Sequence, residues 1–331
     1  MTRKHDIDGS NLGVDEPLSA TANAREIEHA RTTACRNGFA ATKSAIAAYA
    51  LSFAVPFFVV LAAFWANSIY PFGNTSVMMY DMPVQYAQFF GWLSNVLRGD
   101  GSLLYSADAG LGTGTFALFT YYLSSPLNLL VAFCDPSQVP YFFSFLFLVK
   151  IPLAAVACLT FLRGRFEGAG LHGSETTRAL AVVCAIAYSL TSYVTGYASN
   201  IMWIDGVIMA PLACLGVFRL VRDRRCALLF ASVACAILFN WYTGYMVCFF
   251  TIFYFFYEYA RMRIEARETS KAATDGGAQR AKHPLLCQGA RYAATMILAV
   301  GASAVVLFPT LLALLGGKGS GAGLASLVGT V

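Results

Sequence analysis

The feature that most constrains this chain is a series of long apolar segments separated by short polar ones. A helix needs about 20 apolar residues to cross the roughly 30 Å hydrocarbon core of a bilayer, and it satisfies its own backbone there. Such segments lie at about 44–70, 141–163, 178–198, 204–221, 226–241, 242–262 and 291–315. Only 12% of the residues are charged, about half the share of a soluble domain. The sequence predicts an all-α polytopic membrane protein with about seven transmembrane helices.

The basic residues indicate how the chain is oriented. Most of the 23 Lys and Arg residues lie in stretches that flank apolar segments, as topology signals do. Placing these stretches in the cytosol puts residues 71–140 on the extracytoplasmic side and leaves only Arg98, Lys150 and Lys318 out of the cytosol. The net charge of +5 is then explained by topology, and no nucleic-acid partner is expected. We predict a multi-pass plasma-membrane protein with a cytosolic N-terminus.

The apolar segment 116–133 is ambiguous, because it is almost long enough to span but contains four residues that are unusual in a span: Ser124, Ser125, Pro126 and Asn128. If it crossed the membrane, three basic residues of the next loops would lie outside: Arg163, Arg165 and Arg178. The positive-inside rule therefore favours short re-entrant or interfacial helices here.

Two regions follow from this map. Residues 1–43 are polar and are expected to form a largely disordered cytosolic tail, and residues 44–331 form the transmembrane domain. Residues 263–282 are charged and rich in Ala and Gly, which is typical of a flexible linker. The sequence stops soon after an apolar segment, so we expect a chain truncated at its C-terminus.

A short amphipathic helix is predicted behind Asp81. Asp81 is a favoured N-cap residue and Pro83 fits a first helical turn. Apolar residues then recur at helical spacing: Tyr86, Phe89, Phe90, Leu93 and Leu97. Arg98 and Gly99 supply a cation and a glycine stop at the C-terminus. The carboxylate at the start of this helix is our first candidate for catalysis, and the alternative is a plain cap.

The residue types on the predicted outer face limit its chemistry. All four histidines and all eight glutamates fall on the cytosolic side, so a His-based metal centre or a Ser-His triad is excluded there. Aspartate, amide and aromatic side chains remain: Asp81, Gln85, Asp108, Tyr121, Tyr122, Asn200, Asp205, Asn240, Trp241 and Tyr242. This set suits recognition of sugars or polyols, with a carboxylate as base or cation ligand. Asp205 is alternatively a solvated loop residue, and the Gly-rich stretch after Asp108 reads better as a sharp turn.

Lys150 is the one cation inside a predicted span. It lies about nine residues into the segment 141–163, roughly 14 Å along the helix axis. A charge at that depth marks a functional site with a partner in the bundle. The alternative is a structural ion pair with Asp205 or Asp81.

The sequence resembles the bacterial YfhO-like membrane proteins over about residues 70–315. The resemblance rests on Tyr70-Pro71-Phe72-Gly73, Asp81, Gln85-Tyr86, Gly110-Leu111-Gly112-Thr113, Tyr121 to Asn128, Lys150, Asn200 to Asp205, and Asn240 to Tyr245. It implies a GT-C-like bundle that uses a polyprenyl-phosphate-linked sugar on the outer face, with Asp81 at the acidic position of the first large outer loop. It also implies a cell-envelope acceptor such as lipoteichoic acid, in contact with membrane lipids. Family members are usually longer.

These considerations give one mechanistic hypothesis. Asp81 deprotonates an acceptor hydroxyl or holds a divalent cation, for which Asp205 is a second possible ligand, and Lys150 or Arg98 neutralises donor phosphate. The expected substrate-binding residues are Gln85, Tyr86, Arg98, Asp108, Tyr121, Tyr122, Lys150, Asn200, Trp203, Asp205, Asn240, Trp241 and Tyr242. A lipid or polymer transporter and a non-catalytic membrane scaffold are the alternatives.

Overall fold

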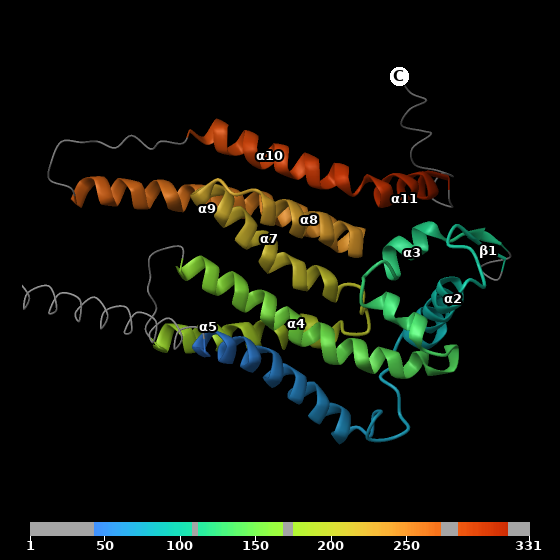
Figure 1. Ribbon diagram of the computed structural model, residues 1–331. Helices are drawn as coiled ribbons and strands as arrows, with labels where there is room; N and C mark the ends of the chain where they lie inside the picture. The colour runs from blue at the N-terminus through green and yellow to red at the C-terminus, as the bar shows by residue number, and fades with distance from the viewer. Residues whose placement is uncertain (1–42, 108–111, 168–174, 273–283, 317–331) are drawn as a thin grey trace, which may run out of the picture. The chain divides into compact units, whose positions relative to one another are not determined.

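The computed structural model of the chain describes residues 43–107, 112–167, 175–272 and 284–316 (Figure 1). The chain divides into two units, Met1–Ala48 and Tyr49–Val331, and apart from the start of the first helix the features below lie in the second unit. The predictions for residues 1–42, Asp108, Lys318 and the C-terminal stretch lie outside the described residues.

Long helices form most of the second unit and run side by side in Figure 1. After the first helix, Lys43–Ala66, they are α4 Val139–Glu167, α5 Glu175–Ser189, α7 Ile204–Asp223, α8 Ala227–Phe239, α9 Trp241–Ala272, α10 Leu285–Ala302 and α11 Ala304–Gly316, and the short α6 Ser192–Gly196 follows α5. The central member is α7, because it contacts α4, α8, α9 and α10. The position of α7 therefore relates these four helices to one another.

Five described helices are long and apolar enough to cross a membrane: Lys43–Ala66, Pro136–Phe166, Glu175–Gly196, Ile204–Asp223 and Leu285–Ala302. The prediction of an all-α polytopic membrane protein is confirmed. The expected number of about seven spans is not, because α8 and α11 are shorter apolar helices. The 32-residue α9 begins with a tyrosine-rich half, which lowers its hydropathy.

Two predicted segments differ from the observed helices. The single span expected at 291–315 is two helices, since α10 ends before Ser303 and α11 begins after it. The Ser303 hydroxyl donates to the carbonyls of Ala299 and Ala234, and it thereby ties the break to α8. The linker expected from residue 263 begins later, because α9 continues to Ala272.

The segment between the first helix and α4 consists of short elements. They are the π-helical turn η1 Met82–Tyr86, α2 Ala87–Arg98, the antiparallel strands β1 Tyr105–Ser106 and β2 Thr113–Gly114, α3 Phe116–Tyr122, and the 3₁₀ turns η2 Asn128–Phe133 and η3 Pro136–Gln138. None of these can span a bilayer, which confirms the prediction of short helices for residues 116–133. As predicted, α2 ends at Arg98, where Gly99 adopts the left-handed conformation with φ of 98°.

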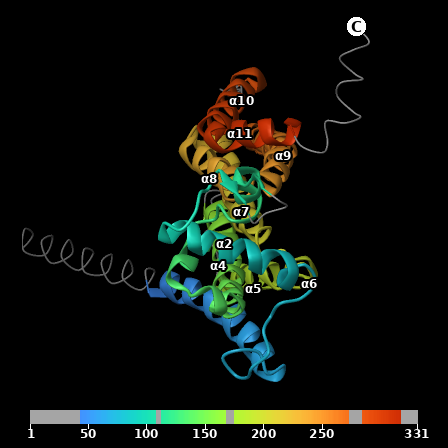
Figure 2. The same cartoon turned by 90° about the vertical axis from the view of Figure 1, so that its right-hand side faces the viewer.

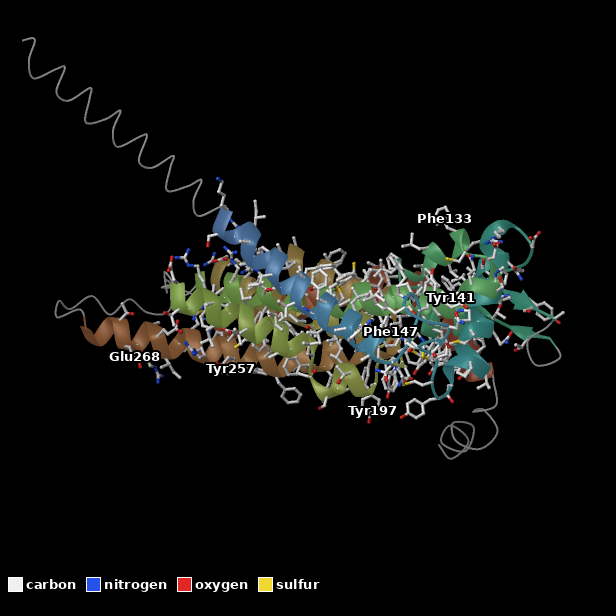
Figure 3. The ribbon with its side chains drawn as sticks, turned by 90° about the horizontal axis from the view of Figure 1, so that it is seen from below. Phe133, Tyr141, Phe147, Tyr197, Tyr257 and Glu268 are labelled. Atoms are coloured by element: carbon white, nitrogen blue, oxygen red, sulfur yellow. The ribbon has the colours of Figure 1, made fainter. Side chains whose placement is uncertain are left out.

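These short elements gather at one end of the long helices, which we call the loop end. In Figure 2, α2 lies crosswise in front of α4 and α7. Figure 3 shows Phe133 and Tyr141 toward this end, and Tyr257 and Glu268 toward the opposite one. Arg163, Arg165 and Arg222 lie near the opposite ends of α4 and α7, which we call the arginine end.

Two apolar clusters hold the helices together. The first lies at the loop end, where Phe90 and Leu93 of α2 pack with Phe143 and Leu146 of α4. The second joins the later half of α7 to α8, α9 and α10. There, a Cβ on Gly216 would lie 2.5 Å from the Leu229 Cα, so only glycine permits this approach of α7 and α8. A small residue that lets two helix backbones approach closely stabilises helix pairs in lipid.

Candidate functional site

The Asp81 carboxylate is exposed at the start of η1, beside a pocket of about 270 Å³. The pocket is lined by Tyr80, Asp81, Tyr86, Gly196, Tyr197, Ser199 and Asn200. The expected side-chain cap does not form, because the Asp81 side chain accepts no capping hydrogen bond. Its backbone carbonyl instead accepts from the N–H groups of Gln85 and Tyr86, at 2.8 and 3.3 Å. The carboxylate therefore remains available to a ligand.

Tyr86 connects this pocket to the segment before α7. Its hydroxyl donates to Asn200 Oδ1 at 2.8 Å. Burial raises the pKa of Tyr86 to about 12, and the neighbouring Tyr122 and the negative charge of Asp81 act in the same direction. The hydroxyl is consequently a neutral donor across the physiological range. Gln85 Nε2 donates to the Tyr122 hydroxyl at 3.4 Å, so the first turn of this helix is tied to α3.

Aromatic residues from three elements meet next to these groups. Tyr121 of α3 lies 5.6 Å from Trp241 and 5.9 Å from Tyr242 between ring centroids. Trp203 donates its indole N–H to the Tyr121 hydroxyl at 3.4 Å, and its ring lies 6.1 Å from that of Tyr242. The Trp241 indole N–H is buried and has no hydrogen-bond partner among the described residues. This aromatic cluster offers ring faces and one unused donor.

Asn240 fixes the geometry of the aromatic cluster at the junction of α8 and α9. It is fully buried, and its amide N–H donates to the Tyr121 carbonyl. Its Oδ1 accepts from the Thr243 N–H at 2.7 Å and from the Thr243 hydroxyl at 2.8 Å. Because both ends of the amide are engaged within the protein, Asn240 positions the aromatic residues and has no free group for a substrate.

Lys150 and Asp205 form a buried ion pair beneath the aromatic cluster. Lys150 Nζ lies 2.7 Å from Asp205 Oδ2 and also donates to the Ile201 carbonyl at 3.3 Å. Asp205 Oδ1 accepts from the Ser125 hydroxyl at 2.9 Å. The two side chains are 0% and 4% exposed. The ion pair between Lys150 and Asp205, one of the two pairings offered by the sequence, is present, and neither residue lines the pocket beside Asp81.

Arg98 lies apart from Asp81, at the other end of the helix. Both η1 and the 12-residue α2 lie between Asp81 and Arg98, and α2 alone extends roughly 18 Å at 1.5 Å per residue. Arg98 contacts Asp135 at 3.4 Å and donates to the carbonyls of Ala132 and Cys134. Its positive charge stabilises the junction between α2 and η2. The expectation that Lys150 or Arg98 neutralises a phosphate beside Asp81 gains no support from these positions.

The donor set around Asp81 offers one carboxylate together with hydroxyl and amide oxygens. No three His, Cys, Asp or Glu side chains converge anywhere in the described part of the chain. Asp205 does not fit as a second ligand, since Lys150 and Ser125 occupy its oxygens. Mg²⁺ is commonly held by one or two carboxylates together with substrate phosphates. Asp81 therefore fits a cation that a phosphate-bearing substrate brings with it.

Several residues of this site were not predicted individually. Tyr80, Tyr197 and Ser199 line the pocket, Ser125 binds Asp205, and Thr243 binds Asn240. Ser125 and Thr243 occur in the motifs that carry the family resemblance, which was the one signal available for them. Tyr197 carries no such signal, because a tyrosine near the end of a span is common at a membrane interface.

The fold and the site define a multi-pass, all-helical membrane protein with a carboxylate, tyrosine and amide site among the short elements at one end. The family model described as bacterial membrane protein YfhO matches residues 52–328, and the chain belongs to this family. A search of curated proteins and a search of solved structures gave no match.

Proposed function

We propose that the chain is a membrane glycosyltransferase of the GT-C type. It transfers a sugar from a polyprenyl-phosphate donor to a polymer of the cell envelope, such as a lipoteichoic acid-like acceptor. The observation that carries this proposal is the exposed carboxylate of Asp81 beside a pocket lined by tyrosines and Asn200. Aromatic rings and amides are the side chains that bind sugars, and a carboxylate is a suitable base for a hydroxyl.

The orientation of this site supports a lipid-linked donor. The loop end and the arginine end lie at opposite ends of α4 and α7. The positive-inside rule assigns the arginine end to the cytosol and the site to the extracytoplasmic face of a bacterial plasma membrane. No nucleotide sugar is available on that face, so the activated sugar has to arrive on a lipid phosphate.

The proposed reaction is a single displacement at the anomeric carbon. Asp81 takes the proton of an acceptor hydroxyl while that oxygen bonds to the anomeric carbon. The bond from this carbon to the phosphate oxygen breaks, and the lipid phosphate leaves with the electron pair. Because a phosphate leaves as a stable anion, the site needs no strong acid. In the alternative role of Asp81, its carboxylate would hold a divalent cation that balances the phosphate charge.

The other residues position this step. Tyr86, held by Asn200, presents a hydroxyl next to Asp81, and Gln85 links the same turn to Tyr122. The Lys150–Asp205 pair joins α4 to α7 and, through Ser125, to the loop before η2. We assign Lys150 and Asp205 a structural role under the site.

Replacement of Asp81 by Asn tests the proposal. Loss of a general base lowers a rate by about 10²–10⁴-fold. Folding should be unaffected, because the Asp81 side chain makes no capping bond. The assay is sugar transfer from polyprenyl-phosphate donor in membranes that contain the chain, with protein level checked by blot. Asp100→Asn is the matched control, since Asp100 is also exposed and lies just beyond α2.

Two results would contradict the proposal. Normal transfer by Asp81→Asn would leave Asp81 without a catalytic role. A wild-type protein that moves lipid or polymer across the membrane but transfers no sugar would support the transporter alternative.

A further inference from the structure

A second pocket lies along one face of α2. Its volume is about 370 Å³, larger than the pocket beside Asp81, and no residue lines both. It is lined by Gln88, Phe89, Gly91, Trp92, Asn95, Ser106, Thr115, Leu118 and Pro136. Phe90 and Leu93 point into the protein from α2, so the pocket occupies the face of α2 that is left uncovered by the core. Its size is within the range of ligand-binding pockets.

The polar groups in this pocket are arranged as a stripe. Gln88, Trp92 and Asn95 follow one another at i, i+4 and i+7, which is one face of a helix. Ser106 of β1 contributes a hydroxyl from another element. None of these four side chains forms a hydrogen bond with another residue that the structure describes. Amide and hydroxyl donors and acceptors beside an indole ring are thus available to a ligand.

The described residues that line this pocket carry no charge. None of them is Asp, Glu, Lys, Arg or His, so they would offer no counter-charge to a phosphate or a carboxylate. Planar amides and hydroxyls bind sugar hydroxyl groups, and the Phe89 and Trp92 rings offer apolar faces on which the C–H face of a sugar can lie. The pocket is therefore suited to a neutral polyhydroxylated molecule, in contrast to the anionic pocket beside Asp81.

Gly91 leaves this space open. It sits in the middle of α2, where glycine is unfavourable compared with other residues. A Cβ at this position would meet nothing within 4 Å, so no packing contact requires glycine. Gly91 lines the pocket, and a side chain there would project into the space that a ligand would occupy.

The two pockets are close enough to serve one reaction. Phe89 lines the second pocket, and its ring centroid lies 5.0 Å from that of Tyr122. Tyr122 in turn accepts the hydrogen bond from Gln85 and lies 5.4 Å from the Tyr86 ring. The rings of Phe89, Tyr122 and Tyr86 thus form a continuous series of contacts from the second pocket to the pocket beside Asp81.

We propose that the second pocket binds a neutral saccharide unit of the acceptor. That the saccharide belongs to the acceptor rests on the proposed glycosyltransferase function. That the pocket binds a saccharide does not rest on that function. The site holds the glycan chain by Trp92 and by the Gln88 and Asn95 amides while a neighbouring unit reaches Asp81. Charged parts of the polymer remain outside this pocket.

The test measures binding rather than transfer. Purified full-length chain in lipid nanodiscs is titrated by calorimetry with maltotriose, cellotriose, N-acetylchitotriose and, for contrast, glycerol 3-phosphate. We expect at least one neutral trisaccharide to bind and glycerol 3-phosphate not to bind. Gly91→Leu fills the pocket and should weaken binding at least 10-fold. Gly289→Leu is the matched control, since Gly289 is also inside a helix with nothing within 4 Å of its Cβ.

A second variant removes recognition without filling the space. Gln88 and Asn95 are exposed, so the double change Gln88→Ala with Asn95→Ala should leave folding intact and weaken binding about 10-fold, as expected for the loss of two hydrogen bonds. Absence of binding by all three trisaccharides, preferred binding of glycerol 3-phosphate, or wild-type binding by Gly91→Leu would each overturn the proposal. The binding assay involves no sugar transfer. A loss of transfer without a loss of binding, or the reverse, therefore distinguishes the catalytic proposal from the binding proposal.

Discussion

Two buried ion pairs, one near each end of the molecule, have the same length but different surroundings. Lys150–Asp205 lies beneath the site at the loop end, and Arg165–Glu258 lies toward the arginine end, both at 2.7 Å. Both oxygens of Asp205 accept hydrogen bonds. In Glu258, Oε1 accepts from Arg165 and Tyr254, while the buried Oε2 has no partner among the described residues.

The two ion pairs differ in how completely their polar atoms are hydrogen-bonded. A buried pair is favourable only when its remaining polar atoms are also satisfied, and the loop-end pair meets that condition through Ser125 and Ile201. The Arg165 guanidinium relies partly on the Phe218 ring, 4.8 Å from its centroid, and Arg165 is 12% exposed. The loop-end pair thus fixes the helices under the site, whereas the arginine-end pair is less completely satisfied.

The largest expected effect comes from Lys150→Met. It leaves the buried Asp205 charge without its partner, which typically lowers stability by about 3–5 kcal/mol. Thermal unfolding of the protein in detergent measures the loss. Adding Asp205→Asn should recover most of the stability, because no buried charge remains. If Lys150→Met is as stable as the wild type but transfers no sugar, Lys150 acts on substrate and the structural role is wrong.

A smaller effect is expected from Glu258→Gln. The Gln side chain can still accept from Arg165 and Tyr254 through one oxygen, and Oε2 has no partner to lose. We expect a loss of about 1.5–3 kcal/mol, the range for hydrogen bonds to charged groups, and no specific loss of sugar transfer. The same unfolding assay applies, and a loss equal to that of Lys150→Met would remove the distinction between the two pairs.

The smallest effect on stability is expected from Tyr86, whose hydroxyl is hydrogen-bonded to Asn200 at the loop end. Burial raises its pKa from 10.0 to about 12, so the folded protein holds this proton more tightly than the unfolded chain. The resulting stability is complete below pH 10 and is lost as the pH rises through 12. An ultraviolet difference titration between wild type and Tyr86→Phe should therefore show one phenol ionising near pH 12. Ionisation near pH 10 would mean that the hydroxyl is not enclosed.

Much of the fold follows from local sequence. Apolar length located the spanning helices, and the basic flanks correctly excluded a span at 116–133. Gly99 marked the end of α2 because the left-handed conformation is costly for other residues. The break at Ser303 was not predicted, since it depends on a contact with Ala234 of α8, and hydropathy along one segment contains no information about such a contact.

The site was predicted in part. Asp81, Tyr86 and Asn200 were named from a motif and from residue type, and the structure brings them together at one pocket. Lys150 and Asp205 are 55 positions apart, so the sequence could offer Asp205 only as one of two partners. The second pocket was missed because Gln88 and Asn95 look like ordinary solvent-facing residues of an amphipathic helix.

The length of α8 determines how deep the site lies. Its 13 residues extend about 20 Å at 1.5 Å per residue, against a hydrocarbon core of about 30 Å. If Arg224 and Arg225, which closely precede α8, lie at the membrane surface as the positive-inside rule predicts, the far end of α8 at Asn240 stops about 10 Å short of the opposite surface. The irregular backbone at this depth must face protein or a water-filled recess. For the proposed lipid-linked donor, the hydrophobic thickness of the surrounding bilayer would therefore set how far the head group descends to reach the aromatic cluster.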